Sequence, residues 1–378
     1  MSRAPARLAN LDLLRFVAVM LVMGRHMAVP PVIPGWPAWV QRFLATWERG
    51  GWVGVDLFFV LSGFLVSGLL FGEFRARGDI SPGRFYLRRG LKIYPAFYVL
   101  LGASAVLLPA SGWPFTGERL LAEMLFVQNY WPGLWNHTWS LAVEEHFYLL
   151  LPIVLWLLIR LNRGSATPLR PVLHLAAASI ATSLALRTIA TWSAPTSYGL
   201  TFYRSQYRLD SLMFGVAMAY AYHWHRDAFM SAFSRRRRLA AAVGAACFAP
   251  AFIWPLGSGP FLHTAGFTLF QAGSGLLLAW ALLAPPVSTP IARFLAYLGT
   301  FSYSVYLWHN AVILQIEPLV ERHLIGPVSY PIRFVLTLAL ALGCGVAMAR
   351  LVEMPGLAIR DRWIPAPPRA ARAGVMPS

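Results

Sequence analysis

Hydrophobic and polar positions alternate along this chain on the scale of whole helices. Apolar runs of about 17–25 residues recur from one end to the other, separated by short polar segments, as in helices that cross a bilayer. The predicted spans are residues 11–33, 52–72, 91–110, 138–160, 171–191, 207–225, 239–256, 263–284, 294–316 and 331–350. The pattern predicts an all-α fold, a polytopic integral membrane protein of about ten transmembrane helices.

The composition supports this interpretation. Hydrophobic residues make up 57% of the 378 positions and charged residues only 12%, whereas a soluble domain carries about 25% charged residues. No polar stretch is long enough to form a second soluble domain. We therefore expect one membrane domain over residues 1–355 and a disordered cytoplasmic C-terminal tail over residues 356–378.

The net charge of +17 suggests a nucleic-acid partner until the positions of the charges are considered. Most of the 32 Lys and Arg residues fall in alternate loops, as the positive-inside rule requires, so they set the topology and no nucleic-acid partner is expected. The distribution predicts a multi-pass protein of the bacterial inner membrane with both termini cytoplasmic. The arginine run at residues 235–238 is expected to contact anionic membrane lipid.

The cysteines do not suggest a metal site. Cys247 and Cys344 lie inside apolar segments, without the close spacing of metal ligands or of a disulfide framework. No metal cofactor is expected.

Ionisable residues inside the predicted spans are the functional candidates, because each costs roughly 2.5–3.5 kcal/mol on insertion. In the first span, Arg15 and His26 are eleven residues apart and share one helix face. A rise of about 1.5 Å per residue places His26, Glu144 or Glu145, and His309 at one depth, roughly 20 Å from the cytoplasmic surface.

A carboxylate beside an imidazole at this depth has a chemical use. Glu144 or Glu145 would orient the ring of His26, whose far nitrogen could then accept the proton of a hydroxyl nucleophile. Two alternatives remain open from the residues alone. A buried His–Glu pair can simply lock helices together, and such residues can also form a proton or ion pathway.

A basic cluster precedes the third predicted span. Arg88, Arg89 and Lys92 lie at a helix start, where cations and backbone N–H groups form an anion site. The phosphates of coenzyme A would suit such a site, although a basic cluster here also serves topology alone.

Several motifs follow one another in order along nearly the whole chain. Besides Arg15 and His26, they are residues 54–64 (GVDLFFVLSGF), 85–95 (FYLRRGLKIYP), 138–148 (TWSLAVEEHFY), 207–211 (YRLDS), 301–309 (FSYSVYLWH) and 352–355 (VEMP). Together they resemble the membrane-bound acyltransferase-3 family, which O-acylates bacterial surface glycans, lipid-linked sugars and, in some members, macrolides.

The resemblance implies a ten-helix core and an acyl donor, usually acetyl-CoA, bound from the cytoplasm. The family's Arg and His of the first helix correspond to Arg15 and His26, and its Arg-x-x-Arg element to Arg89 and Lys92. Lys92 departs from the commonest form and loses the planar fork that grips phosphate bidentately.

The predicted function is transfer of an acyl group, expected to be acetyl, from coenzyme A to a sugar hydroxyl of a bacterial exopolysaccharide or its lipid-linked repeat unit. The predicted catalytic residues are His26, Arg15 (an oxyanion stabiliser), Glu144 and Glu145. The predicted donor site comprises Arg88, Arg89, Lys92 and Tyr94. The predicted acceptor site comprises Asp56, Trp139, Ser140, Tyr148, Arg208, Asp210, Trp308 and His309.

Three other functions fit the same residues. The buried charges would serve a transporter or flippase of a lipid-linked sugar, an O-acyltransferase acting on a macrolide or glycolipid, or a binding protein without chemistry. Direct transfer and an acyl-His26 intermediate are both compatible with the sequence.

Overall fold

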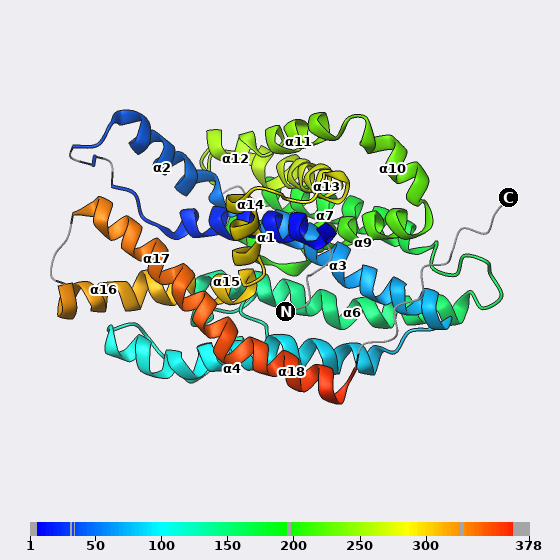
Figure 1. Cartoon of the computed structure of the whole chain (residues 1–378), viewed down its shortest axis with the longest axis horizontal. Coiled ribbons are helices and arrows are strands. Elements are labelled where there is room, and N and C mark those ends of the chain that lie inside the picture. Colours follow the sequence, from blue (N-terminus) through cyan, green and yellow to red (C-terminus); the bar gives the residue numbers. More distant parts are fainter. Residues whose placement is uncertain (1–5, 31, 34, 195–197, 326–328, 366–378) are drawn as a thin grey trace.

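The structure is a computed structural model of the chain, and it describes residues 6–30, 32–33, 35–194, 198–325 and 329–365. The described residues form helices joined by short loops, without a strand. Figure 1 shows that α3, α4, α6 and α18 run roughly along the longest axis of the molecule. The predicted all-α fold is confirmed.

The α-helices follow one another along the whole chain. They are α1 (Ala6–His26), α2 (Ala38–Gly50), α3 (Gly54–Arg77), α4 (Pro82–Ala110), α5 (Gly117–Met124), α6 (Trp139–Leu161), α7 (Val172–Ser193), α8 (Tyr198–Tyr203), α9 (Leu209–Trp224), α10 (Arg226–Ser234), α11 (Arg237–Ala246), α12 (Ala249–Ile253), α13 (Phe267–Leu283), α14 (Pro290–Gly299), α15 (Ser302–Ala311), α16 (Glu317–Val320), α17 (Tyr330–Met348) and α18 (Met354–Trp363).

Short 3-10 and π-helical segments connect or extend them. They are η1 (Gly51–Val53), η2 (Asn136–Thr138), η3 (Ser205–Tyr207), η4 (Leu262–Gly266), η5 (Val312–Ile316), η6 (Glu321–Ile325) and η7 (Ala349–Glu353).

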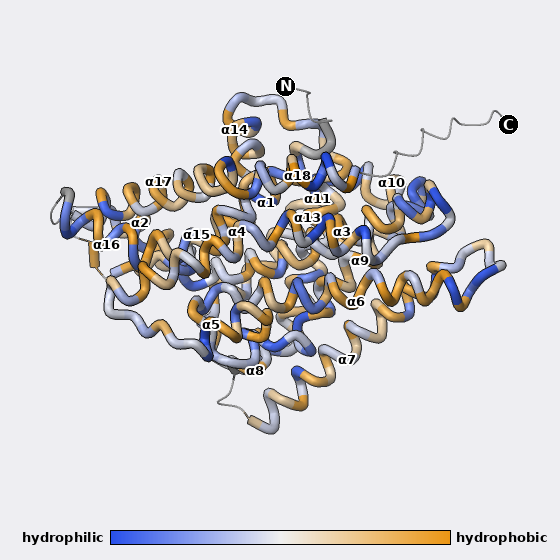
Figure 2. The backbone as a smooth tube through the Cα atoms, turned by 90° about the horizontal axis from the view of Figure 1, so that it is seen from below, coloured by the Kyte–Doolittle hydropathy of each residue, from blue (hydrophilic) through white to orange (hydrophobic). Residues whose placement is uncertain are grey.

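Six helical stretches of the described chain are long and apolar enough to cross a membrane. They are Ala38–Arg77, Pro82–Ala110, Asn136–Leu161, Val172–Ser193, Leu262–Leu283 and Tyr330–Trp363. Hydrophobic residues run along the outer helices α7 and α17, and hydrophilic residues gather in the loops at both ends of the long axis (Figure 2). The protein is therefore a multi-pass membrane protein, and the count of ten spans stays a prediction.

The boundaries of three predicted spans are wrong. The first helix ends at His26 rather than residue 33, and Pro30 follows soon afterwards, which disfavours continuation of the helix. The span over residues 239–256 is divided into α11 and α12, with Pro250 in the first turn of α12. The span over residues 294–316 is divided into α14 and α15, and Gly299 at the break lies against α1, where an added Cβ would be 1.8 Å from the Asp12 carbonyl oxygen.

The expectation of a disordered tail from residue 356 is also wrong over part of its length. Residues Met354–Trp363 form α18, which packs on α4. Gly356 permits the close approach, because a Cβ there would be 2.9 Å from the Leu91 carbonyl oxygen. Arg88 of α4 adds an ion pair to Asp361 (3.1 Å). The part of the predicted tail over residues 366–378 lies outside the described residues.

Close packing of α3 against α9 positions one side of the candidate site. A Cβ added at Gly63 would be 2.0 Å from the Leu212 carbonyl oxygen, and one added at Gly215 would be 2.3 Å from that of Val60. Small residues at such crossings let helix backbones approach within a membrane. The absence of a side chain at Gly63 and Gly215 therefore permits the close crossing of α3 and α9.

Candidate active site

Three histidines from separate elements meet inside the helix bundle. His26 lies at the end of α1, His137 in η2 directly before α6, and His309 in α15. The ring centroids are 5.0 Å apart for His26 and His309, 4.8 Å for His137 and His309, and 6.3 Å for His26 and His137. His26 and His309, which the sequence predicted at one depth, lie beside each other, and His137 joins them.

Hydrogen bonds orient two of the three rings. His309 Nδ1 donates to the Tyr306 carbonyl oxygen (2.5 Å), so its Nε2 carries the lone pair, and that buried nitrogen has no hydrogen-bond partner among the described residues. His137 Nε2 donates to the Leu307 carbonyl oxygen (3.1 Å), while its Nδ1 accepts from Asn310 Nδ2 (3.0 Å). Both rings are thereby held by α15, and His309 offers a free proton acceptor to a neighbour.

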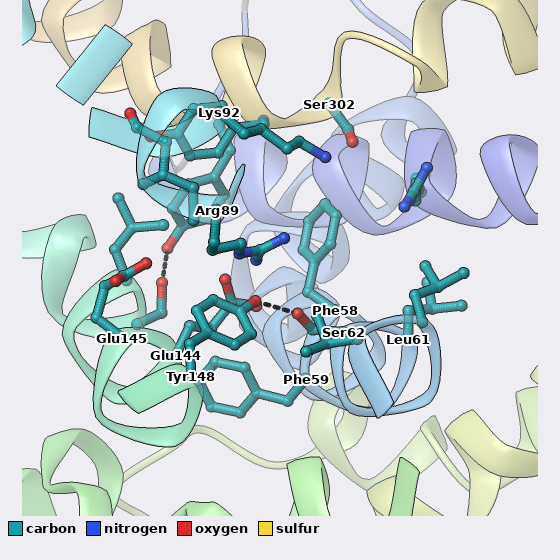
Figure 3. A pocket seen from close by; sticks show the side chains of 18 of the residues that line it. Phe58, Phe59, Leu61, Ser62, Arg89, Lys92, Glu144, Glu145, Tyr148 and Ser302 are labelled. Carbon is teal, nitrogen blue, oxygen red and sulfur yellow. Dashed lines mark hydrogen bonds between the residues drawn. The ribbon is translucent and has the colours of Figure 1, made fainter. Parts of the chain in front are cut away.

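A cavity lined by charged residues, which we call the cation cavity, lies between α1, α3, α4, α6 and α15. It has an empty volume of about 960 Å³ and is lined by the cations Arg15, Arg89 and Lys92 and by the acids Glu144, Glu145 and Glu353. In Figure 3, Arg89 and Lys92 point into this cavity from α4, and Glu144, Tyr148 and Ser62 face Arg89.

The residues around Arg89 are held by direct contacts. The Arg89 guanidinium carbon lies 3.9 Å from the centroid of the Tyr148 ring, and the Tyr148 hydroxyl is hydrogen-bonded to Ser62. The Tyr94 hydroxyl donates to Glu145 Oε2 (3.2 Å). A cation stacked on an aromatic ring and facing a cavity is preorganised for an anionic ligand.

His26 and His137 line a second cavity, which we call the histidine cavity, with an empty volume of about 840 Å³. Val55 and Tyr306 line both the histidine cavity and the cation cavity. The Tyr306 hydroxyl donates to the His137 carbonyl oxygen (2.7 Å) and is hydrogen-bonded to Ser140 Oγ (2.5 Å). The two cavities therefore meet at a wall formed by these side chains.

The structure does not bring Glu144 or Glu145 to His26, contrary to the sequence prediction. Both acids line the cation cavity, and no hydrogen bond joins either of them to His26 in the part of the chain that is described. The reason is the start of α6: its N-terminal extension η2 places His137 beside His26, and Glu144 lies seven residues, about 10 Å, further along the helix.

The four residues of the predicted donor site divide between two faces of α4. Arg89 and Lys92, three residues apart, share one helix face and line the cation cavity. Arg88 lies on another face, where it pairs with Asp361 and donates to the Ile364 carbonyl oxygen. Tyr94 lines a neighbouring cavity together with Arg89 and Glu145.

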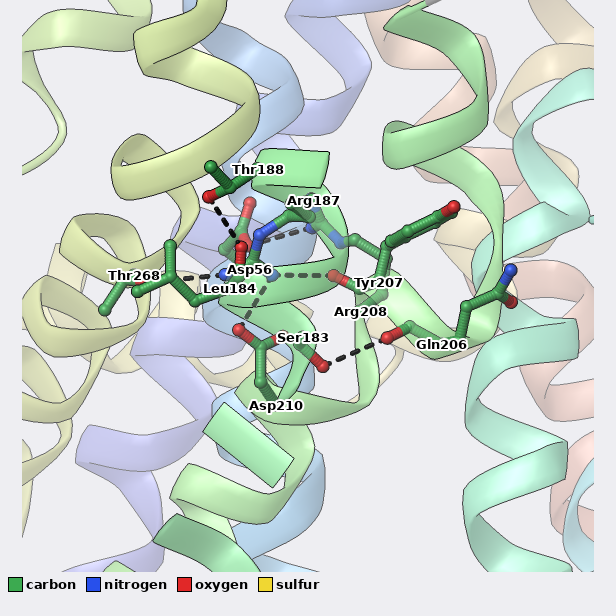
Figure 4. A network of polar contacts seen from close by, with 10 residues as sticks. All are labelled: Asp56, Ser183, Leu184, Arg187, Thr188, Gln206, Tyr207, Arg208, Asp210 and Thr268. Atoms are coloured by element: carbon green, nitrogen blue, oxygen red, sulfur yellow. Dashed lines mark hydrogen bonds and ion pairs between the residues drawn. The ribbon is translucent and has the colours of Figure 1, made fainter. Parts of the chain in front are cut away.

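Three residues of the predicted acceptor site belong to a buried ion-pair network (Figure 4). Asp56 pairs with Arg208 (2.8 Å), and Asp210 pairs with Arg187 (2.8 Å). The Arg208 guanidinium carbon also lies 3.9 Å from the centroid of the Phe267 ring. These contacts join α3, α7, α9 and α13, and they give Asp56, Arg208 and Asp210 partners within the protein.

The other predicted acceptor residues lie closer to the cavities. Trp139 lines the histidine cavity, and Ser140 and Tyr148 line the cation cavity. Trp308 is 4% exposed and lines neither cavity. His309 is fully buried beside His26.

Comparison with known proteins identifies the family. Residues 8–350 match a family described as an acyltransferase domain. The chain belongs to the acyltransferase-3 family. The match includes all three histidines and the three cations of the cation cavity.

Relatives within the acyltransferase-3 family include two named O-acetyltransferases. The peptidoglycan O-acetyltransferase OatA of Listeria monocytogenes is 27% identical over 339 residues, covering 82% of this chain and 50% of that protein. The O-acetyltransferase OatA of Staphylococcus aureus is 26% identical over 364 residues, covering 89% of this chain and 56% of that protein. The chain thus spans about half the length of the curated relatives it matches. No solved structure matches it.

Two site residues of this acyltransferase-3 chain were not predicted from the sequence. His137 precedes the predicted fourth span by one residue, so the hydropathy pattern places it in a loop. Glu123 of α5 accepts hydrogen bonds from the Trp135 backbone N–H (3.1 Å) and from Thr138 Oγ1 (2.9 Å), which holds the approach to His137 in place. Burial raises the pKa of Glu123 to about 7.

Proposed function

We propose that this protein is an O-acyltransferase that moves an acetyl group from coenzyme A to a sugar hydroxyl of a bacterial surface glycan. The observation that carries the proposal is the junction of the two cavities. A chamber with three cations suits the phosphates of coenzyme A, and the adjoining chamber presents imidazoles to an alcohol. Membership in the acyltransferase-3 family and the names of two relatives support the same reaction.

In the proposed reaction, His26 is the general base. One of its ring nitrogens accepts the proton of the sugar hydroxyl as the oxygen attacks the thioester carbonyl carbon. The carbon–sulfur bond then breaks, the thiolate takes the proton from His26, and the products are the O-acetyl sugar and free coenzyme A. Acid quenching during turnover distinguishes this direct transfer from a route through acyl-His26.

We assign to His309 the orienting role that the sequence suggested for Glu144 or Glu145. The free Nε2 of His309 can accept a hydrogen bond from one N–H of His26, which leaves the other His26 nitrogen unprotonated toward the acceptor. Arg15, Arg89 and Lys92 bind the donor. Arg15 lies about 16 Å from His26 along α1, too far to stabilise an oxyanion that forms beside His26, so the oxyanion role predicted for Arg15 is not kept. Arg88 keeps α18 on α4.

The acceptor that we propose is an exopolysaccharide or its lipid-linked repeat unit at the inner membrane, reached from the side opposite the cytoplasmic termini. Peptidoglycan, named for the Listeria relative, is the second candidate. NMR of purified exopolysaccharide and of peptidoglycan from a strain lacking the gene distinguishes them, because only the true acceptor loses its O-acetyl signals.

The test of the reaction uses the full chain in proteoliposomes supplied with radiolabelled acetyl-CoA and glycan. We expect His26→Ala to reduce acetyl transfer about 10²- to 10⁴-fold. His174→Ala, an exposed position on α7, is the matched control and should retain activity. Near-normal transfer by His26→Ala would refute the assignment. Wild-type protein that carries unmodified glycan across the membrane without consuming acetyl-CoA would instead establish a transporter.

A further inference from the structure

A third cavity, which we call the loop cavity, lies between the segment after α5 and the helix α8. It has an empty volume of about 860 Å³. The residues that line it and matter here are Gln128, Asn129, Tyr130, Trp131, Tyr203 and Arg204. These six residues are outside the predicted donor and acceptor sites, whereas Trp139 of the predicted acceptor site also lines the loop cavity.

Two aromatic side chains in the loop cavity are open to a ligand. Trp131 is 66% exposed and Tyr130 is 38% exposed. The Tyr130 hydroxyl donates to Gln206 Oε1 (2.7 Å), which fixes the direction of its ring. An exposed, oriented aromatic ring is a flat apolar surface, and the C–H face of a pyranose packs on such a surface.

Two amides beside these rings lack partners for their oxygens. Gln128 and Asn129 are 8% and 5% exposed, and their NH2 groups donate to the Thr138 carbonyl oxygen (3.0 Å) and to Ser205 Oγ (2.8 Å). Gln128 Oε1 and Asn129 Oδ1 have no hydrogen-bond partner among the described residues. A buried acceptor without a partner is unfavourable. Each of these oxygens has less than 1 Å² of exposed surface, so a ligand hydroxyl would reach it only if neighbouring side chains moved.

Arg204 adds hydrogen-bond donors to the loop cavity. The Arg204 side chain lines the loop cavity and forms no ion pair among the described residues. Its N–H groups donate hydrogen bonds, whereas the two amide oxygens accept them. Sugar hydroxyls do both, so the loop cavity offers complementary groups together with an aromatic floor.

The loop cavity adjoins the histidine cavity. Asn136, Trp139 and Tyr203 line both of them. A linear glycan with one sugar at His26 would therefore extend its neighbouring units past Trp139 toward Trp131.

We propose that the loop cavity is a binding subsite for the sugar units next to the one that is acetylated, so that the acceptor is an oligosaccharide or polysaccharide rather than a monosaccharide or a compact small molecule. The role of the subsite in acetyl transfer rests on the proposed function, but the binding of glycan to it can be measured separately.

The test compares Trp131→Ala with Trp113→Ala. Trp113 is 47% exposed, precedes α5 and is not among the residues that line the loop cavity, so it controls for loss of an interfacial tryptophan. The probes are tetramers and monomers of β-linked glucose and N-acetylglucosamine. Binding is measured by calorimetry on protein in nanodiscs, and acetyl transfer is measured in proteoliposomes.

We expect wild-type protein to bind a tetramer at least tenfold more tightly than its monomer. Trp131→Ala should raise the KM for the tetramer roughly fivefold to tenfold, with little change in kcat or in transfer to the monomer. Asn129→Ala should act in the same direction, and Trp113→Ala should match wild type.

The outcomes separate the two proposals. If wild-type protein binds neither tetramer better than its monomer, or if Trp131→Ala and Trp113→Ala behave alike, the subsite is overturned while the acetyl transfer stands. If tetramer binding depends on Trp131 but no acetyl group is ever transferred, the subsite stands and the proposed function fails.

Discussion

At the scale of single residues, the orienting role that we assign to His309 Nε2 leads to a specific prediction. If this nitrogen orients His26, His309→Ala should lower kcat by about 10²-fold or more and leave the KM for acetyl-CoA nearly unchanged. His309→Gln places an amide oxygen near the position of Nε2 and should recover a large part of the activity. Acetyl transfer kinetics at saturating donor measure both variants.

A purely structural His309 would give a different result. Both substitutions would then lower thermal stability, and the glutamine would rescue nothing. The pH dependence of kcat provides the second readout, because loss of the orienting partner should shift the acidic limb of the profile for His309→Ala, whereas His309→Gln should stay close to the wild-type profile.

The identity of the residues that meet at His26 could be predicted only in part. Helical rise from an assumed start placed His309 correctly at the depth of His26. The same calculation placed Glu144 there, because the sequence does not reveal that η2 carries His137 inward before α6 begins. The prediction was therefore wrong by about two helical turns, and it placed Glu144 beside His26 where the structure has His137.

At the scale of helices, the crossing of α3 and α9 depends on the absence of a side chain at Gly63. Gly63→Ala would place a methyl group 2.0 Å from the Leu212 carbonyl oxygen, so the helices must separate. We expect a loss of about 1–3 kcal/mol in the free energy of unfolding. Thermal unfolding in detergent micelles measures the change.

Gly72 of the same helix is the matched control, because no atom lies within 4 Å of a Cβ added there. Gly72→Ala should be neutral or stabilise α3 by about 0.5–1 kcal/mol through helix propensity. Equal effects at the two positions would show that backbone entropy, and not the close crossing, decides the outcome.

Some helix boundaries have a local signal in the sequence, whereas others depend on a contact with another helix. Pro82 follows the capping residue Ser81 at the start of α4, as local chemistry favours. The break between α14 and α15 has no such signal nearby, since Gly299 lies against the Asp12 carbonyl of α1. Tertiary contacts of this kind decide boundaries that hydropathy alone leaves continuous.

At the scale of the whole molecule, the buried ion pairs join helices that are distant in sequence. Arg208→Met leaves the Asp56 carboxylate buried without its partner and should destabilise the protein by about 3–5 kcal/mol. The double variant Asp56→Leu with Arg208→Met should recover much of that loss. Thermal unfolding with the single and double variants measures the coupling.

The same variants test the role that the sequence suggested for this pair. A pair that binds the acceptor would give a well-folded Arg208→Met protein with a raised KM for glycan, and the double variant would be no better. The structure favours the first result because both side chains are almost completely buried and hydrogen-bonded to each other.

The all-helical membrane fold could be predicted from hydropathy, because backbone groups in lipid must be satisfied within helices. The positions of the cavities could not. They depend on which faces of α1, α3, α6 and α15 turn toward one another. The periodicity of hydrophobic residues does not specify which helices pack together when every face of a helix is apolar.

The shared wall of Val55 and Tyr306 has a consequence for membrane integrity. A transporter usually exposes its binding site to one side of the bilayer and then the other by moving whole groups of helices. In this protein the cation cavity and the histidine cavity are instead separated by side chains. In the proposed reaction only a two-carbon unit needs to pass this barrier. Nucleotide and polysaccharide can each stay in their own compartment, and the cell keeps its ion gradients while its surface is chemically modified.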